Sequence, residues 1–264
     1  MFPPMYATLR QGAVAFALGV AFAIPAAFAQ PAIPAPTGEA ATVKRTLEQK
    51  FPGAEVRYVA KSPFSGLYEA LLGDQMVYTD AKANQILVGS IFDVATKQNL
   101  TDAKVRKLNR IAVDKLPMDL AFVKVKGNGA RKLIVFSDAD CPFCHRLETE
   151  MKGLDNVTIY TFLFPIDQLH PDAARKSKQI WCAPDKVKAW DEFFASGKLP
   201  DNKGECGDPV DKTQALGNSL KINATPTLIF ADGSMIPGAL SLAQIEKELT
   251  SADAEMKKLA TAPR

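Results

Sequence analysis

Residues 133–148 read "LIVFSDADCPFCHRLE": an apolar run, a short polar segment, and two cysteines three positions apart. The continuous apolar run predicts a strand that is buried on both faces of a sheet. Pro142 suits the first position of a helix, where no backbone N–H donor is needed. The stretch therefore predicts a buried strand that leads directly into a helix opened by a C-P-F-C motif.

Three chemistries fit the C-P-F-C motif, which His145 follows directly: a redox dithiol, half of a zinc site, or the attachment site of a c-type haem. The strand-to-helix setting favours the dithiol. A haem would also need a second axial ligand, for which Met151 or Met235 is available. A zinc site would lack a second close pair of ligands, since its remaining ligands would have to come from Cys182, Cys206 and His170.

The spacing of the motif predicts different roles for its two thiols. Cys141 would lie at the helix N-terminus, where unpaired backbone N–H groups and the helix dipole favour a thiolate. Cys144 would lie about one turn inside the helix. We therefore expect Cys141 to be the exposed nucleophile and Cys144 the buried partner. His145 could add positive charge near the sulfur, or it could be a solvated or packed side chain.

On the carboxyl side of the motif, strand and helix patterns alternate. We expect a strand over 157–164, three helices over 171–182, 184–196 and 209–220, a hairpin over 225–237 around Asp232 and Gly233, and a closing helix over 241–252. On its amino side, residues 120–127 predict a strand that forms a hairpin with the buried strand through the turn "GNG". Helices on both faces of one sheet, an α/β layer fold, are the expected result.

The first half of the chain carries a different pattern. Residues 39–51 predict a short helix with Val43, Leu47 and Phe51 on one face. Residues 55–94 contain short β-type runs separated by turns, which predict a small antiparallel sheet without Cys or His. Residues 101–116 predict an amphipathic linker helix capped by Thr101 or Asp102.

The N-terminus has the layout of a secretory signal peptide. Arg10 precedes the apolar run 12–29, which ends in the small-residue triplet Ala27-Phe28-Ala29. A membrane anchor is the weaker alternative because Pro25 interrupts the run. The formal net charge of the 264 residues is +3, which gives no reason to expect a nucleic-acid partner. We expect an exported, periplasmic protein.

Three further stretches make a family resemblance specific. Together with 133–148, residues 88–94 "VGSIFDV", 180–190 "IWCAPDKVKAW" and 222–238 "INATPTLIFADGSMIPG" resemble the DsbC/DsbG family of bacterial periplasmic disulfide isomerases, which have a thioredoxin fold. The resemblance covers nearly all of the chain after residue 29. It implies a mixed α+β and α/β protein with four parts: a signal peptide (1–29), an N-terminal antiparallel dimerisation domain (30–97), a linker helix (98–119), and a thioredoxin-like catalytic domain with a helical insertion (120–264).

The resemblance also assigns the site. It implies that Cys141 and Cys144 are catalytic and that Pro142, Phe143, His145, Thr225 and Pro226 are their neighbours, with a cis bond before Pro226 whose preceding backbone pairs with substrate. Cys182 and Cys206 are expected to form a structural disulfide, because two such cysteines pair in an oxidising compartment. A second redox pair is the alternative, although no C-x-x-C spacing supports it.

The expected activity is isomerisation or reduction of wrong disulfides in exported proteins. The resemblance implies misoxidised exported proteins as substrates, a homodimer, and a membrane electron donor of the DsbD type; no metal and no cofactor are expected. One alternative is a DsbG-like reductase that protects single cysteines, because Pro142 and Phe143 stand where the isomerase typically has Gly and Tyr, and DsbG has Pro and Tyr. A c-type haem electron carrier is the remote alternative.

Overall fold

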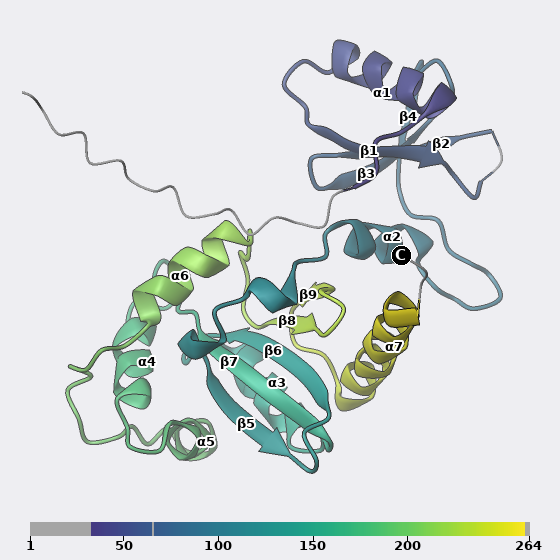
Figure 1. Cartoon of the computed structure of the whole chain (residues 1–264). Helices are drawn as coiled ribbons and strands as arrows, with labels where there is room; N and C mark the ends of the chain where they lie inside the picture. The colour runs from purple at the N-terminus through teal and green to yellow at the C-terminus, as the bar shows by residue number, and fades with distance from the viewer. Residues whose placement is uncertain (1–32, 65, 262–264) are drawn as a thin grey trace, which may run out of the picture.

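The computed structural model describes residues 33–64 and 66–261. The expected signal peptide, residues 1–29, lies outside the described residues. Two separate sheets organise the rest, one of four strands near the N-terminus and one of five strands whose central strand leads to the C-P-F-C motif (Figure 1). No helix among the described residues is long and apolar enough to cross a membrane.

The N-terminal sheet is antiparallel throughout, as the pattern predicted. Its strands pair in sequence order. They are β1 (Val56–Lys61), β2 (Tyr68–Leu72), β3 (Gln75–Thr79) and β4 (Ile86–Val88). Helix α1 (Gly38–Lys50) lies over this sheet (Figure 1). Val43 and Leu47 of α1 are fully buried against it, whereas Phe51 lies beyond the end of the helix and is 41% exposed. The predicted apolar stripe is therefore one residue shorter than expected.

The linker helix is also shorter than predicted. Helix α2 spans Leu100–Leu108, and the side chain of Asn99 caps it by accepting a hydrogen bond from the Asp102 N–H. The expectation that Thr101 or Asp102 is the cap, and that the helix continues to residue 116, is wrong. Two short 3-10 turns follow instead, Val113–Lys115 and Met118–Leu120.

Tertiary contacts explain why the helix ends early. The N–H of Ile111 donates to the carbonyl of Gly233 at 3.0 Å. The guanidinium of Arg110 pairs with the carboxylates of Asp232 and Glu255 at 2.6 and 3.1 Å. The side chain of Ile111 is buried in the core of the second sheet. These contacts bind residues 110–111 to the five-stranded sheet and the closing helix, so the chain does not continue as a helix there.

The second sheet has the strand order β5-β7-β6-β8-β9. Its strands are β5 (Phe122–Lys126), β6 (Arg131–Ser137), β7 (Val157–Leu163), β8 (Thr227–Phe230) and β9 (Met235–Pro237). Helix α3 (Pro142–Met151) connects the parallel pair β6 and β7, and β8 runs antiparallel to β6. The predicted hairpin between β5 and β6 is wrong: β7 lies between them and pairs with both. The hairpin of β8 and β9 is confirmed.

Strand β6 is the centre of this sheet and is covered on both faces. Leu133 and Val135 pack with residues of α3 and of the closing helix α7 (Leu242–Thr261). Ile134 and Phe136 pack on the opposite face with residues of α6 (Val210–Ser219) and of the linker. Alternate side chains of a strand point to opposite faces, so a strand buried on both faces must be apolar throughout. This explains the uninterrupted run "LIVF".

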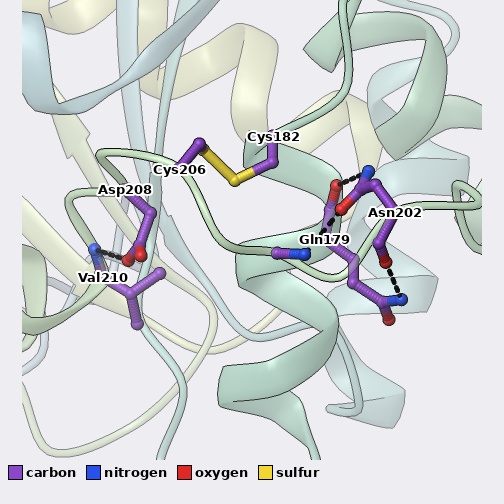
Figure 2. Close-up of a disulfide and its surroundings, with 7 residues drawn as sticks. Gln179, Cys182, Asn202, Cys206, Asp208 and Val210 are labelled. Carbon is purple, nitrogen blue, oxygen red and sulfur yellow. Dashed lines mark hydrogen bonds between the residues drawn. A yellow bond between two sulfur atoms is a disulfide. The ribbon is translucent and has the colours of Figure 1, made fainter.

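Between β7 and β8 the chain inserts three helices. They are α4 (Ala173–Trp181), α5 (Lys186–Ser196) and α6. A disulfide joins Cys182, directly after α4, to Cys206 in the loop before α6 (Figure 2). Beside it, the side chains of Gln179 and Asn202 each donate to the backbone carbonyl of the other at 2.6 and 2.9 Å. The disulfide and these bonds fix the loop against α4.

Substitution of Gly233 tests its backbone contact with Ile111, where the linker helix has ended. Its φ is +82°, and a Cβ added there would lie 2.1 Å from the carbonyl oxygen of Ile111. We expect Gly233→Ala to lower the free energy of unfolding by roughly 3 kcal/mol, because backbone strain and a backbone clash add. The control is Gly197→Ala, at φ +75° in open space, which should cost about 1 kcal/mol from strain alone. Equal losses in urea unfolding would contradict the role of this contact.

Candidate active site

Cys141 is the residue that precedes helix α3, and three residues separate it from the end of β6. Its thiol lies 3.2 Å from the carbonyl oxygen of Thr225 and donates a hydrogen bond to it. The peptide bond between Thr225 and Pro226 is cis. Only 4% of Cys141 is exposed, so the expectation of an exposed sulfur is wrong. The loop that contains Thr225, which no local pattern at the motif reveals, lies against the sulfur.

The surroundings of Cys141 favour its thiolate. They lower its pKa from an ordinary 9.0 to about 5. The largest cause is a hydrogen bond from the thiol of Cys144, and the side chain of Thr225 and the backbone N–H groups of Phe143 and Cys144 add to it, while burial opposes them. These N–H groups are unpaired donors at the start of the helix. A Cys141 thiolate is thus present at neutral pH.

Cys144 has the opposite character. Its side chain is fully buried on the inner face of α3, and this burial raises the pKa of its thiol far above the ordinary value. The negative charge that a Cys141 thiolate carries nearby raises it further. The N–H of Asp138 donates to the Cys144 sulfur at 3.4 Å. The two thiols are therefore strongly different, one acidic and one held protonated.

A buried carboxylate holds the turn between β6 and Cys141. The side chain of Asp138 is fully buried and accepts three hydrogen bonds: from the N–H of Asp140 at 2.8 Å, from the N–H of Ile166 at 2.8 Å, and from Nδ1 of His170 at 2.9 Å. It thus joins the turn that carries Cys141 to the segment that follows β7. Buried carboxylates need such donors, because an unpaired one is costly.

The two neighbours that flank Cys144 have different surroundings. Phe143 is 61% exposed and gives the dithiol an apolar surface. The imidazole of His145 stacks on Phe194 of α5, with ring centroids 4.2 Å apart, and its Nε2 lies 3.2 Å from the carbonyl oxygen of Ala139. Of the two alternatives for His145, the structure shows the packed side chain.

A cavity of about 280 Å³ lies along α3 from His145 to the end of the helix. Glu148, one turn after Cys144, lines it and accepts a hydrogen bond from the indole N–H of Trp190 at 2.8 Å. Burial raises the pKa of Glu148 to about 7. His145 and Phe194 also line this cavity. A carboxyl group that titrates near neutrality is thus positioned on the same helix as the dithiol.

Sequence reasoning missed three residues around the dithiol. Ser137 is the last residue of the buried strand and Asp138 follows it directly. The carboxyl end of a strand is where sites commonly form, so this position is an available signal. Glu148 had no signal, because its burial depends on Trp190 from a distant helix. His170 was considered only as a zinc ligand. A zinc site that uses Cys182 and Cys206 is incompatible with the disulfide that joins them.

Two family models match the chain. A thioredoxin-like domain matches residues 118–253, and the N-terminal domain of disulfide bond isomerase proteins matches residues 28–102. A solved disulfide interchange protein from Neisseria gonorrhoeae is 44% identical, with a TM-score of 0.50, over 52% of this chain and 98% of that one.

Curated relatives agree with these matches. The probable thiol:disulfide interchange protein DsbC of Bordetella pertussis is 38% identical over 215 residues, which are 81% of this chain and 76% of the relative. The thiol:disulfide interchange protein DsbC of Escherichia coli K12 is 26% identical over 202 residues, which are 75% of this chain and 82% of the relative. These comparisons favour a DsbC-type protein over the DsbG-like alternative and support a dithiol over a haem site.

The acidity of Cys141 can be measured by alkylation of the reduced protein with iodoacetamide. Because only the thiolate reacts, the rate should rise with pH through a midpoint near 5, far below the ordinary thiol pKa of 9.0. Cys144→Ala should raise this midpoint, since it removes the hydrogen bond that lowers the pKa most. Mass spectrometry should find the label on Cys141. A midpoint above pH 8, or faster labelling of Cys144, would contradict the assignment.

Proposed function

The chain belongs to the DsbC family of thiol:disulfide interchange proteins, and we propose that it isomerises wrong disulfides in exported proteins with Cys141 as nucleophile and Cys144 as resolving thiol. Family membership gives the enzyme class, a thiol-disulfide oxidoreductase with disulfide isomerase activity. The assignment of the two thiols rests on their positions, with Cys141 directly before the first turn of α3 and Cys144 on the buried face of that helix, and on the pKa shifts that these positions cause. The pKa of Cys141 is lowered to about 5, whereas that of the fully buried Cys144 is raised.

The first step is a thiol-disulfide exchange. The Cys141 thiolate attacks one sulfur of a substrate disulfide, the substrate S–S bond breaks, and the second substrate sulfur leaves as a thiolate. The enzyme and the substrate are then joined by a mixed disulfide. A thiol with a low pKa is also a good leaving group, so this mixed disulfide is readily broken again at Cys141.

Two routes lead on from the mixed disulfide. In the first, another substrate thiolate attacks it, Cys141 leaves as a thiolate, and the substrate carries a rearranged disulfide. In the second, Cys144 loses its proton and attacks Cys141, a Cys141–Cys144 disulfide forms, and the substrate leaves reduced. The second route consumes the enzyme's dithiol. Two electrons from a membrane donor of the DsbD type would restore it.

Apolar and backbone groups around the dithiol suit a misfolded protein chain as substrate. Phe143 and Leu169 are 61% and 67% exposed. Leu169 immediately precedes His170, which Asp138 ties to the turn that carries the dithiol. The carbonyl of Thr225 lies 3.2 Å from the Cys141 sulfur and loses its donor when Cys141 ionises, so it can then accept a hydrogen bond from an extended substrate segment.

Two copies of the chain would associate through their N-terminal domains. Strand β4 is an edge strand, and an edge of unpaired backbone groups invites pairing with another chain. The segment from β4 onward presents exposed apolar side chains: Leu87 at 55%, Val88 at 61%, Phe92 at 58% and Val94 at 79%. Burial of this surface in a homodimer would remove it from water.

The proposed location is the periplasm. The N-terminal layout of a signal peptide supports export. The disulfide between Cys182 and Cys206 suits an oxidising compartment, where such bonds persist. Because the bond closes a loop with a sequence separation of 24, it would stabilise the fold by about 3 kcal/mol in the chain-entropy model. We assign it a structural role.

Refolding of a scrambled multi-disulfide protein in a glutathione buffer tests the activity. We expect the full chain to restore the native disulfides well above the rate of the buffer, and Cys141→Ala to remove this gain. Cys144→Ala should retain part of the activity, because substrate thiols can still resolve the mixed disulfide, and it should accumulate enzyme–substrate adducts on non-reducing gels. Full activity of Cys141→Ala would disprove the proposed mechanism.

Sedimentation tests the proposed dimer. The chain should sediment as a dimer at micromolar concentration. Val88→Lys should shift it toward the monomer, because a charged side chain would replace an apolar one at the edge of β4. Val125→Lys is the matched control, since Val125 is equally exposed, at 60%, on edge strand β5 of the other sheet. A monomeric chain, or equal effects of both variants, would contradict association through β4.

A further inference from the structure

We propose that the hydroxyl of Ser137 is a positioning group for the resolving thiol: it donates a hydrogen bond to the Cys144 thiolate as this attacks the mixed disulfide. The inference rests on the proposed function, since it concerns the second route described above. It adds to the dithiol a residue that acts on Cys144 and not on the incoming substrate.

Ser137 lies on the face of β6 that packs against α3. Side chains of a strand alternate between faces, so Ser137 shares a face with Leu133 and Val135. These two pack against Leu147 and Met151 of α3. Cys144 belongs to the same buried face of that helix, about one turn before Leu147. The last side chain of this face of the strand therefore lies opposite the first buried side chain of the helix.

Two polar groups near Cys144, the Ser137 hydroxyl and the Asp138 N–H, differ in their hydrogen bonding. Only 1% of Ser137 is exposed, and its hydroxyl oxygen has no hydrogen-bond partner among the residues that the structure describes. A buried hydroxyl without a partner is costly, and such groups in native structures often have a functional reason. The next residue, Asp138, already donates its N–H to the Cys144 sulfur at 3.4 Å.

A thiolate at Cys144 would satisfy this hydroxyl. The neutral thiol is a weak acceptor, whereas the thiolate accepts hydrogen bonds well, and bonds to charged groups are the stronger ones. The Ser137 hydroxyl lowers the pKa of Cys144 and so opposes the burial that raises it. With a thiolate at Cys144, the hydroxyl would join the Asp138 N–H as a second donor to the same sulfur.

The timing of the reaction makes this donor useful. While Cys141 is a thiolate, its charge disfavours a second negative charge on Cys144. Formation of the mixed disulfide removes that charge. Cys144 can then lose its proton to solvent and attack the Cys141 sulfur; the bond from Cys141 to the substrate breaks, and the substrate sulfur leaves with the electron pair. Donors to Cys144 stabilise its thiolate at this stage.

Oxidised glutathione separates the two steps in the reduced, full chain. Acid quenching and mass spectrometry follow first the Cys141–glutathione adduct and then the Cys141–Cys144 disulfide. We expect Ser137→Ala to slow the second step roughly fivefold to tenfold and to move its pH midpoint upward, with a change below about twofold in the first step. Ser177→Ala is the matched control, because Ser177 of α4 is also a fully buried serine whose hydroxyl has no hydrogen-bond partner in the described part of the chain.

A second pair of variants separates the effect of the hydroxyl from effects of side-chain shape or of folding. Ser137→Thr keeps the hydroxyl and Ser137→Val replaces it by a methyl group, so the two side chains differ little in volume. The second step should be at least threefold slower in the valine variant than in the threonine variant, because valine cannot donate a hydrogen bond to the Cys144 thiolate. Equal rates in this pair, or equal slowing of both steps in Ser137→Ala, would overturn the inference. Failure of the unmodified chain to form the adduct would instead contradict the proposed function.

Discussion

The site depends on the hydrogen bonds that the buried carboxylate of Asp138 accepts. Strand β6 ends at Ser137, and only the four residues 138–141 lie between it and the start of α3 at Pro142. Asp138 accepts bonds from the next turn, from the segment after β7, and from His170. Burying the carboxylate without these donors would cost much free energy. The hydrogen bonds therefore hold the turn that carries Cys141 against the segment that follows β7. That arrangement places Cys141 at the start of the helix and Cys144 beneath it.

The asymmetry between the two thiols follows from this geometry. The sulfur at the open end of α3 meets backbone N–H groups, the side chain of Thr225 and the thiol of its partner, and each of them favours the thiolate. The sulfur one turn later meets apolar side chains and resists ionisation. The difference in pKa thus comes from the helix end and the core together. Of the two residues between the cysteines, Pro142 begins the helix and Phe143 provides an exposed apolar surface.

The thioredoxin-like part and the N-terminal part are built differently. The first has a core on both faces of its sheet and carries all four cysteines. The second has α1 on one face of its sheet and α2 on the other, and its edge strand β4 is followed by exposed apolar residues. The polypeptide between them does not remain helical, because Arg110 and Ile111 bind to the β8–β9 hairpin. Residues 110 and 111 are therefore anchored on the thioredoxin-like part, whereas α2 packs against the N-terminal sheet.

The sequence by itself determined the elements and the chemistry that depend on neighbours along the chain. The run "LIVF", Pro142 and the spacing of Cys141 and Cys144 predicted the buried strand, the helix start and the dithiol, because burial on two faces and helix capping are local constraints. Only the tertiary structure decided that β7 separates β5 from β6, that α2 ends at Leu108, and that the Thr225 carbonyl covers the Cys141 sulfur. Each of these depends on hydrogen bonds between residues far apart in the sequence, whose partners no local pattern identifies.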